Sequence, residues 1–151
     1  MKLLIMLYYI AYFSRDIAVI YENGYGNIVG RLKDLVIRGG ENLYPREIEE
    51  VLLRHPNVQD AYVIGVPDER FGEELCAWVK LNKTIEKKAG NSNFEINDSS
   101  SIKVYLKQHL AHFKVPKYFL FVDEFPTTVT GKVQKYKMKE ESIEKLGLMN
   151  I

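Results

Sequence analysis

Residues 30–50 of the chain read GRLKDLVIRGGENLYPREIEE, and this stretch decides how the rest of the sequence is interpreted. Pro45 suits the first turn of a helix, where no backbone amide hydrogen is needed, and apolar residues recur after it at helical spacing. Before it, Gly39 and Gly40 permit a tight turn in which the backbone can approach another molecule closely. The stretch therefore predicts a helix that ends near His55, preceded by a glycine turn that is a candidate binding surface.

Upstream of this stretch, two short β-prone runs, IAVIY at residues 17–21 and YGNIVGRL at residues 25–32, flank the segment Glu22-Asn23-Gly24. The Asn-Gly pair supplies the positive backbone angles that a tight turn between two strands requires. These runs predict a β-hairpin.

Three apolar runs follow the predicted helix: DAYVIGV at residues 60–66, ELCAWVKL at residues 74–81 and YFLFVDEF at residues 118–125. Their length and their β-branched and aromatic content favour buried strands. Apolar residues at helical spacing predict another helix near residues 102–110 and a short terminal helix after Lys132. The predicted fold class is α+β, with a β-hairpin followed by a small sheet of about three strands packed with helices.

The composition limits the functions that the chain can have. With 151 residues, of which 46% are hydrophobic, it can bury one ordinary core, so a single domain is expected. Lys and Arg total 21 against 20 acidic residues, and a net charge of +1 gives no general field for attracting nucleic acid. A lysine-rich tail and aromatics beside a strand occur in nucleic-acid-binding modules, but the near-neutral charge and the lack of an RNP-type motif argue against that function.

Cysteine and histidine residues give no sign of a metal centre. Cys76 is the only cysteine and lies in an apolar run, so we expect a small core residue in a reducing compartment. His55, His109 and His112 show no metal-ligand spacing with it. No bound metal is predicted for this chain.

Three blocks carry a resemblance to a known family: residues 30–50, VPDERFGEE at residues 66–74 and FPTTVTGKVQK at residues 125–135. Together with HFKVPKY at residues 112–118, they resemble the C-terminal domain of the adenylate-forming superfamily, most closely that of medium-chain fatty acyl-CoA synthetases. The resemblance implies the fold of the small lid domain of these enzymes. In the family, a fatty acid reacts with ATP to give acyl-adenylate, and the lid then rotates and presents another face for thioester formation with CoA.

The resemblance implies a set of adenylation residues. Lys132 corresponds to the lysine that stabilises charge in the adenylation transition state, although a lysine in a Thr/Gly-rich loop is by itself usually only solvated. Arg31 and Asp16 correspond to the residues that bind the ribose hydroxyls, and Asn42 to a position near the nucleotide phosphate. The alternative for Arg31 is a surface ion pair with Asp34.

A second set of residues is implied for the hinge and for CoA. Lys33 matches the hinge at which the lid pivots by backbone rotation. Gly39 and Gly40 match the turn that lines the pantetheine tunnel, with a simple tight turn as the alternative, and Glu41 lies beside CoA. Arg70 could contact a CoA phosphate, but ion pairs with neighbouring carboxylates are the simpler expectation.

The domain organisation follows from the extent of the resemblance. We expect an apolar leader at residues 1–15, the lid domain at residues 16–140 with a mobile polar loop near residues 82–101, and a tail at residues 141–151. Asp16 follows Ser-Arg where the family has Thr-Gly, so the leader is either a substitute for the family's preceding segment or a terminal strand. Its apolar run stops short of the ~20 residues that a spanning helix needs, so no stable membrane span is expected.

The sequence therefore predicts the C-terminal lid fragment of a fatty acid-CoA ligase. The phosphate-binding loop and the acyl pocket belong to the family's large N-terminal domain, so we expect small-molecule substrates to reach the chain through that domain and little activity without it. ATP or AMP and CoA are the family substrates, with Mg²⁺ accompanying ATP in the complete enzyme and not bound by this chain. A free-standing, non-catalytic module that binds CoA, AMP or a partner is the alternative. An intracellular location is expected, in the mitochondrion or the cytosol.

Overall fold

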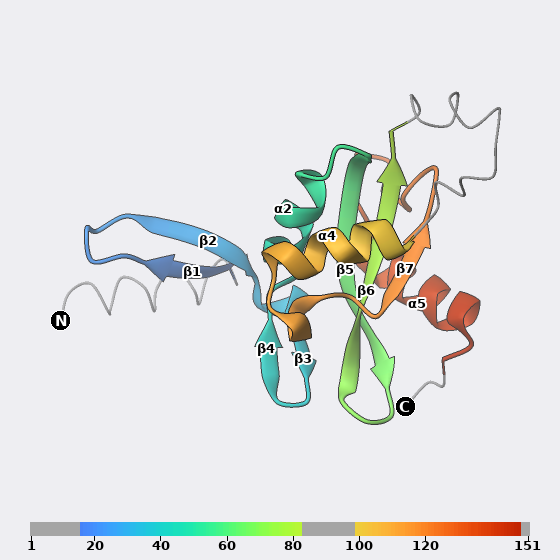
Figure 1. Cartoon of the computed structure of the whole chain (residues 1–151), viewed down its shortest axis with the longest axis horizontal. Coiled ribbons are helices and arrows are strands. Elements are labelled where there is room, and N and C mark those ends of the chain that lie inside the picture. Colours follow the sequence, from blue (N-terminus) through green and yellow to red (C-terminus); the bar gives the residue numbers. More distant parts are fainter. Residues whose placement is uncertain (1–15, 83–98, 149–151) are drawn as a thin grey trace.

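The computed structural model describes residues 16–82 and 99–148. Within them, the predicted β-hairpin is confirmed: β1 (Asp16–Ile20) pairs antiparallel with β2 (Gly26–Arg31), and the hairpin projects away from the other elements (Figure 1). The expected leader at residues 1–15 lies outside the described residues, as does most of the expected polar loop. The last residues of that loop are helical, because a helix begins at Ser99.

The small sheet that the sequence predicted is confirmed, and the structure extends it to five strands. The strands are β3 (Val36–Arg38), β4 (Glu41–Leu43), β5 (Val58–Asp68), β6 (Gly72–Leu81) and β7 (Tyr118–Phe121). β5 and β6 form a long antiparallel pair, and β7 runs parallel to β6. The Gly39-Gly40 turn joins β3 and β4, two strands that the sequence did not predict.

Helices cover both faces of this sheet (Figure 1). They are α2 (Pro45–Leu53), α4 (Ser99–His109) and α5 (Lys135–Leu146), with short 3₁₀ turns η1 (Leu32–Asp34) and η2 (His112–Lys114). The predicted helix with Pro45 in its first turn is confirmed. Helix α5 continues past residue 140 and buries Ser142, so the packed unit includes part of the expected C-terminal tail. None of the described helices is long and apolar enough to cross a bilayer.

Alternating side chains of β5 and β6 form two cores. Ala61 and Val63, with Leu75, Ala77 and Val79, pack in the cluster that includes residues of α2 and α4. The intervening residues Ile64, Val66, Cys76 and Trp78 pack with Met138 of α5. Because successive strand residues point to opposite faces, a strand buried on both sides reads as a continuous apolar run, as these two do.

A buried hydroxyl group joins α5 to the second core. Ser142 Oγ accepts a hydrogen bond from Trp78 Nε1 (2.8 Å) and donates one to the carbonyl oxygen of Met138 (2.7 Å). Cys76 Sγ lies 3.7 Å from the same hydroxyl, and burial raises the pKa of the thiol to about 11. Cys76 is thus a core residue, as the sequence predicted, and its thiol stays protonated at neutral pH.

We expect Ser142→Ala to destabilise the domain by about 1–3 kcal/mol, because the indole N–H of Trp78 then loses its buried acceptor. Urea unfolding followed by circular dichroism measures the change. Trp78→Phe removes the donor, so no buried N–H group is left without an acceptor when Ser142→Ala is added. In the Trp78→Phe background, Ser142→Ala should therefore lower the free energy of unfolding by less than it does in the parent. Equal losses in the two backgrounds would contradict the proposed coupling.

His55 predicts a pH dependence of stability. The side chain is 9% exposed, its Nδ1 accepts a hydrogen bond from the backbone N–H of Asn57, and burial lowers its pKa from 6.5. Since the fold favours the neutral ring, the stabilisation is present above pH 6.5 and is lost as the pH falls through the lowered pKa. We expect the free energy of unfolding to fall between about pH 7.5 and pH 5.5. His55→Asn, which keeps an acceptor but does not titrate, should reduce that fall, whereas His112→Asn at an exposed position should not.

Candidate functional site

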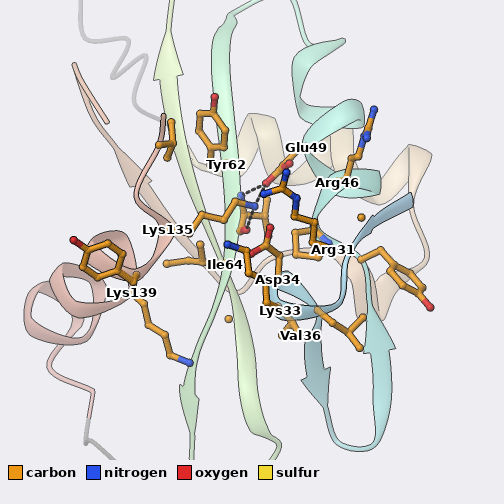
Figure 2. A pocket seen from close by; sticks show the side chains of 18 of the residues that line it. Arg31, Lys33, Asp34, Val36, Arg46, Glu49, Tyr62, Ile64, Lys135 and Lys139 are labelled. Carbon is orange, nitrogen blue, oxygen red and sulfur yellow. Dashed lines mark hydrogen bonds and ion pairs between the residues drawn. The ribbon is translucent and has the colours of Figure 1, made fainter. Parts of the chain in front are cut away.

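A cavity of about 1110 Å³ opens between the β1–β2 hairpin, the first turn of α2, β5 and the loop that precedes α5 (Figure 2). Four of the site residues predicted from the sequence line it: Asp16, Arg31, Lys33 and Lys132. They come from three separate segments of the chain. The fold therefore brings together the residues assigned to adenylation and to the hinge, apart from Asn42.

Asp16 and Arg31 face each other across the hairpin. They are directly opposed in the antiparallel register, and Arg31 Nε lies 3.3 Å from Asp16 Oδ1. The described partner of Arg31 is thus Asp16 and not Asp34, the alternative considered from the sequence. The Arg31 side chain is 61% exposed, so its remaining N–H donors are available to a ligand that enters the cavity.

Lys33 lies in the only connection between the hairpin and the sheet that the described residues contain. It occupies the middle of η1, between the end of β2 at Arg31 and the start of β3 at Val36, and its side chain is exposed. Lys33 lines the cavity, and Figure 2 shows it close to Asp34. A short, exposed connection of this kind is where backbone rotation can reorient one part of a fold relative to another.

Lys132 lies on a tight loop held by its own hydrogen bonds. Thr128 N–H donates to the carbonyl oxygen of Lys132 (2.8 Å), Lys132 N–H donates to Thr128 Oγ1 (3.1 Å), and Gly131 has a positive φ of 80°. The backbone is fixed while the side chain is exposed. No ion pair within the described part of the chain uses the Lys132 ammonium group. The loop thus presents a cation to the cavity without neutralising it.

An ion pair anchors the end of this loop to the wall of the cavity. Glu49 Oε1 accepts hydrogen bonds from Lys135 Nζ (2.7 Å) and from the backbone N–H of Val63 (2.9 Å). Lys135 Nζ also donates to the carbonyl oxygen of Val63 (3.2 Å). Figure 2 shows Glu49 and Lys135 pointing toward each other from α2 and from the start of α5. The three elements α2, β5 and α5 therefore meet at one point.

Gly39, Gly40, Glu41 and Asn42 lie on the β3–β4 hairpin, and none of them lines the cavity. Both glycines have positive φ, 57° and 89°. The three predicted CoA residues are therefore together, while Asn42, which the sequence placed near the nucleotide phosphate, is grouped with them and not with Arg31.

The glycine turn rests on the ring of Phe71. Gly39 N–H donates to the carbonyl oxygen of Phe71 (2.9 Å), and a Cβ on Gly39 would lie 3.0 Å from Phe71 Cδ1. The guanidinium of Arg38 lies 4.1 Å from the centre of the same ring, and Arg38 Nε donates to both carboxylate oxygens of Glu74 at 2.8 Å. The turn therefore packs against the Phe71 ring, and the Arg38–Glu74 ion pair lies next to it.

Arg70 does not form the ion pairs expected from the sequence. Its guanidinium lies 5.0 Å from the centre of the Phe71 ring. Among the described residues, the nearby carboxylates of Asp68, Glu73 and Glu74 form their ion pairs with other cations. Asp68 pairs instead with Lys117 at 2.9 Å, and the hydrogen bond from Lys117 lowers the pKa of that carboxyl group.

Sequence reasoning missed the residues that support the site. Glu49 and Lys135 look like ordinary members of a charged helix surface, and their contact spans 86 positions in the chain. Glu74 has a clearer signal in the sequence, because it is an acidic residue at the start of an apolar run. In the structure it is only 2% exposed. A buried carboxylate requires a charged or donating partner, which here is Arg38.

Comparisons with known proteins identify the family of the chain. The model of the AMP-binding enzyme C-terminal domain family matches residues 47–132. The chain belongs to this family. Among members with similar sequences, the Bacillus subtilis (strain 168) protein YngI is 50% identical over 136 residues, which cover 90% of this chain and 23% of YngI. The mouse mitochondrial medium-chain acyl-CoA ligase ACSF2 is 46% identical over 137 residues, which cover 91% of this chain and 21% of ACSF2.

Solved structures of the family show the same fold. The ATP-bound crystal structure of MatB from Rhodopseudomonas palustris matches with a TM-score of 0.70 and 40% sequence identity, and the match covers 85% of this chain and 24% of that one. This family member and the two sequence relatives are several times longer than the matched region. The chain thus spans 21–23% of the length of these two relatives and corresponds to one of their domains.

Gly39→Ala should destabilise the domain by about 1–3 kcal/mol, because an alanine at a positive φ is strained and its Cβ would press against Phe71. Thermal unfolding of the two proteins measures the difference. Gly30→Ala is the matched control, since a Cβ there would meet nothing within 4 Å and the residue lies in β2. An equal effect of the two substitutions would contradict a special role for the Gly39 turn.

Proposed function

We propose that the chain is the C-terminal lid of an ATP-dependent fatty acid-CoA ligase and that it works with an adenylation domain. The observation that carries the proposal is the separation of the predicted residues into two groups. Asp16, Arg31 and Lys132 converge on one cavity, whereas Gly39 and Gly40 lie on a different hairpin. A lid that serves two half-reactions in turn needs two such surfaces. The name of the relative ACSF2, a medium-chain acyl-CoA ligase, supports the choice of substrate class.

In the first half-reaction, the fatty acid carboxylate attacks the α-phosphate of ATP, and pyrophosphate leaves as the acyl-adenylate forms. We propose that Lys132 stabilises the negative charge that develops between these groups, since a preformed cation at the reacting atoms is worth more in the transition state than in the ground state. Arg31 and Asp16 bind the ribose hydroxyls, as donor and acceptor respectively. Asn42 contacts the nucleotide phosphate only if the hairpin that carries it approaches the nucleotide in one position of the lid.

In the second half-reaction, the CoA thiol loses its proton, its sulfur attacks the acyl carbonyl carbon of the acyl-adenylate, and AMP leaves as the thioester forms. Backbone rotation at Lys33 turns the lid so that the β3–β4 hairpin faces the reaction centre. Gly39 and Gly40 then line the path of the pantetheine arm, because the missing side chains allow close approach of the backbone. Glu41 lies beside CoA in this position.

The substrates that the proposal requires are ATP, a fatty acid and CoA. ATP is supported by the ATP-bound structure of MatB. Within the described residues, no group of three or more His, Cys, Asp or Glu side chains is placed to hold a metal ion. Mg²⁺ enters the proposal with the phosphates of ATP in the complete enzyme. We place the enzyme in the mitochondrion or the cytosol, and the mitochondrial name of ACSF2 supports the first of these.

The second candidate function is a non-catalytic module that binds CoA, AMP or a partner. This module would use the same cavity and the same β3–β4 hairpin, but it would need no adenylation domain. Calorimetric titration of the chain with AMP and with CoA separates the candidates, because the proposed lid contributes only part of each site and should bind both weakly. Tight binding by the chain alone would favour the second candidate.

Lys132→Ala tests the proposed catalytic role. The chain is joined to the adenylation domain of a relative such as YngI, and each half-reaction is measured separately. We expect fatty acid-dependent pyrophosphate exchange to fall roughly 10²–10³-fold, because the transition state loses its cation. Conversion of purified acyl-adenylate to acyl-CoA should change much less. Lys137→Ala, an exposed lysine that does not line the cavity, is the control. Equal loss in both half-reactions would contradict the assignment.

A further inference from the structure

We infer that two separate, partly buried ion pairs position the two groups of predicted site residues: Glu49–Lys135 holds the loop of Lys132, and Arg38–Glu74 holds the Gly39-Gly40 turn. The inference rests on the proposed function for its catalytic consequence. Its structural content, that each pair orders one segment and not the other, can be tested on the chain itself.

The first pair joins the Lys132 loop to the sheet. Lys135 begins α5 and is three positions after Lys132, so fixing Lys135 fixes the end of the loop. Its ammonium group is held by Glu49 Oε1 at 2.7 Å and by the carbonyl oxygen of Val63 at 3.2 Å. Glu49 is itself oriented by the backbone N–H of Val63 at 2.9 Å. The pair is thus a closed arrangement of three hydrogen bonds that fixes α5 to both α2 and β5.

The second pair joins the glycine turn to β6. Arg38 is the last residue of β3 and immediately precedes Gly39, while Glu74 lies near the start of β6. Arg38 Nε lies 2.8 Å from both carboxylate oxygens of Glu74, and the guanidinium covers the Phe71 ring at 4.1 Å. Glu74 Oε1 also accepts a hydrogen bond from the backbone N–H of Leu75 at 2.9 Å. These contacts fix the ring on which Gly39 rests.

Burial distinguishes these two pairs from the surface pairs. The side chains of Lys135 and Glu49 are 26% and 15% exposed, and those of Arg38 and Glu74 are 23% and 3% exposed. By contrast, Lys145 and Glu141 on α5 are 50% and 43% exposed. An exposed pair is screened by water and orders its partners weakly, whereas a mostly buried pair is directional and specifies one geometry.

The two pairs share no residue and connect different elements. Glu49–Lys135 connects α2 and α5 and lines the cavity, whereas Arg38–Glu74 connects β3 and β6 and does not line it. Loss of one pair should therefore disorder one surface and leave the other in place. Because misplacement of a reacting group by about 1 Å can reduce a rate roughly 10²-fold, each half-reaction should depend on its own pair.

The order of the two segments is tested first, by amide hydrogen exchange of the full chain followed by NMR. The probes are the N–H groups of Gly131 and Lys132 for the loop and of Gly39 for the turn, which all form hydrogen bonds in the structure. We expect Glu49→Gln to increase exchange at Gly131 and Lys132 by roughly tenfold or more and to leave Gly39 near its parent rate. Glu74→Gln should have the opposite pattern.

Two further variants separate positioning from general damage to the fold. Lys135→Arg keeps the positive charge, so hydrogen exchange at Gly131 and Lys132 should stay near the parent rate. The double variant Glu49→Gln with Lys135→Met removes both charges, so it leaves no buried unpaired ion and should remain folded, yet the loop should still exchange faster. Glu141→Gln, in the exposed pair of α5, is the control and should change neither segment.

The catalytic consequence is tested in the enzyme formed by joining the chain to an adenylation domain. We expect Glu49→Gln to reduce pyrophosphate exchange roughly tenfold to a hundredfold and acyl-CoA formation from acyl-adenylate much less, and Glu74→Gln to show the reverse. The inference would be overturned if either variant slowed both half-reactions equally. It would also be overturned if either variant increased hydrogen exchange equally in the Lys132 loop and in the Gly39-Gly40 turn. A parent fusion inactive in both half-reactions would count against the proposed function, while the exchange measurements would still decide whether the pairs act separately.

Discussion

The antiparallel pair of β5 and β6 is buried on both faces, and the three helices are placed by that constraint. A strand pair that is apolar on one side only can face water, but this pair must be covered twice. Helices α2 and α4 cover one face and α5 covers the other. The loop that carries Lys132 precedes α5 and packs on the same face through Phe125 and Val133, and Lys132 lines the cavity.

Two of the ion pairs at this apolar framework connect it to segments that carry predicted site residues. Glu49 lies on α2 and Glu74 lies on β6 itself, and each has a cationic partner on the segment that it holds. An apolar contact would stabilise these places equally well, but it would specify orientation less closely. The arrangement suits a lid that is rigid within itself and changes position as a unit, with rotation confined to the short connection that contains Lys33.

The sequence was sufficient for the parts of the fold that follow local rules. Asn23-Gly24 predicted the hairpin, Pro45 predicted the start of α2, and the apolar runs predicted β5, β6 and β7. Strands β3 and β4 were missed because three residues are too few to show a periodicity, and they become strands only through pairing with each other and with β6. Asp16 and Arg31 could be connected through family resemblance, whereas the contact of Glu49 with Lys135 depends on the way α5 docks, which no local pattern encodes.

The hydrogen bond between Trp78 and Ser142 has an optical consequence. The chain contains one tryptophan, and its indole is buried in the core beneath α5, with the Lys145 ammonium 4.9 Å from the ring. Its emission therefore comes from a single, buried environment and reports whether α5 is packed on the sheet. The projecting hairpin can move without altering that emission. The molecule thus carries an intrinsic fluorophore that reports the packing of α5 on the sheet.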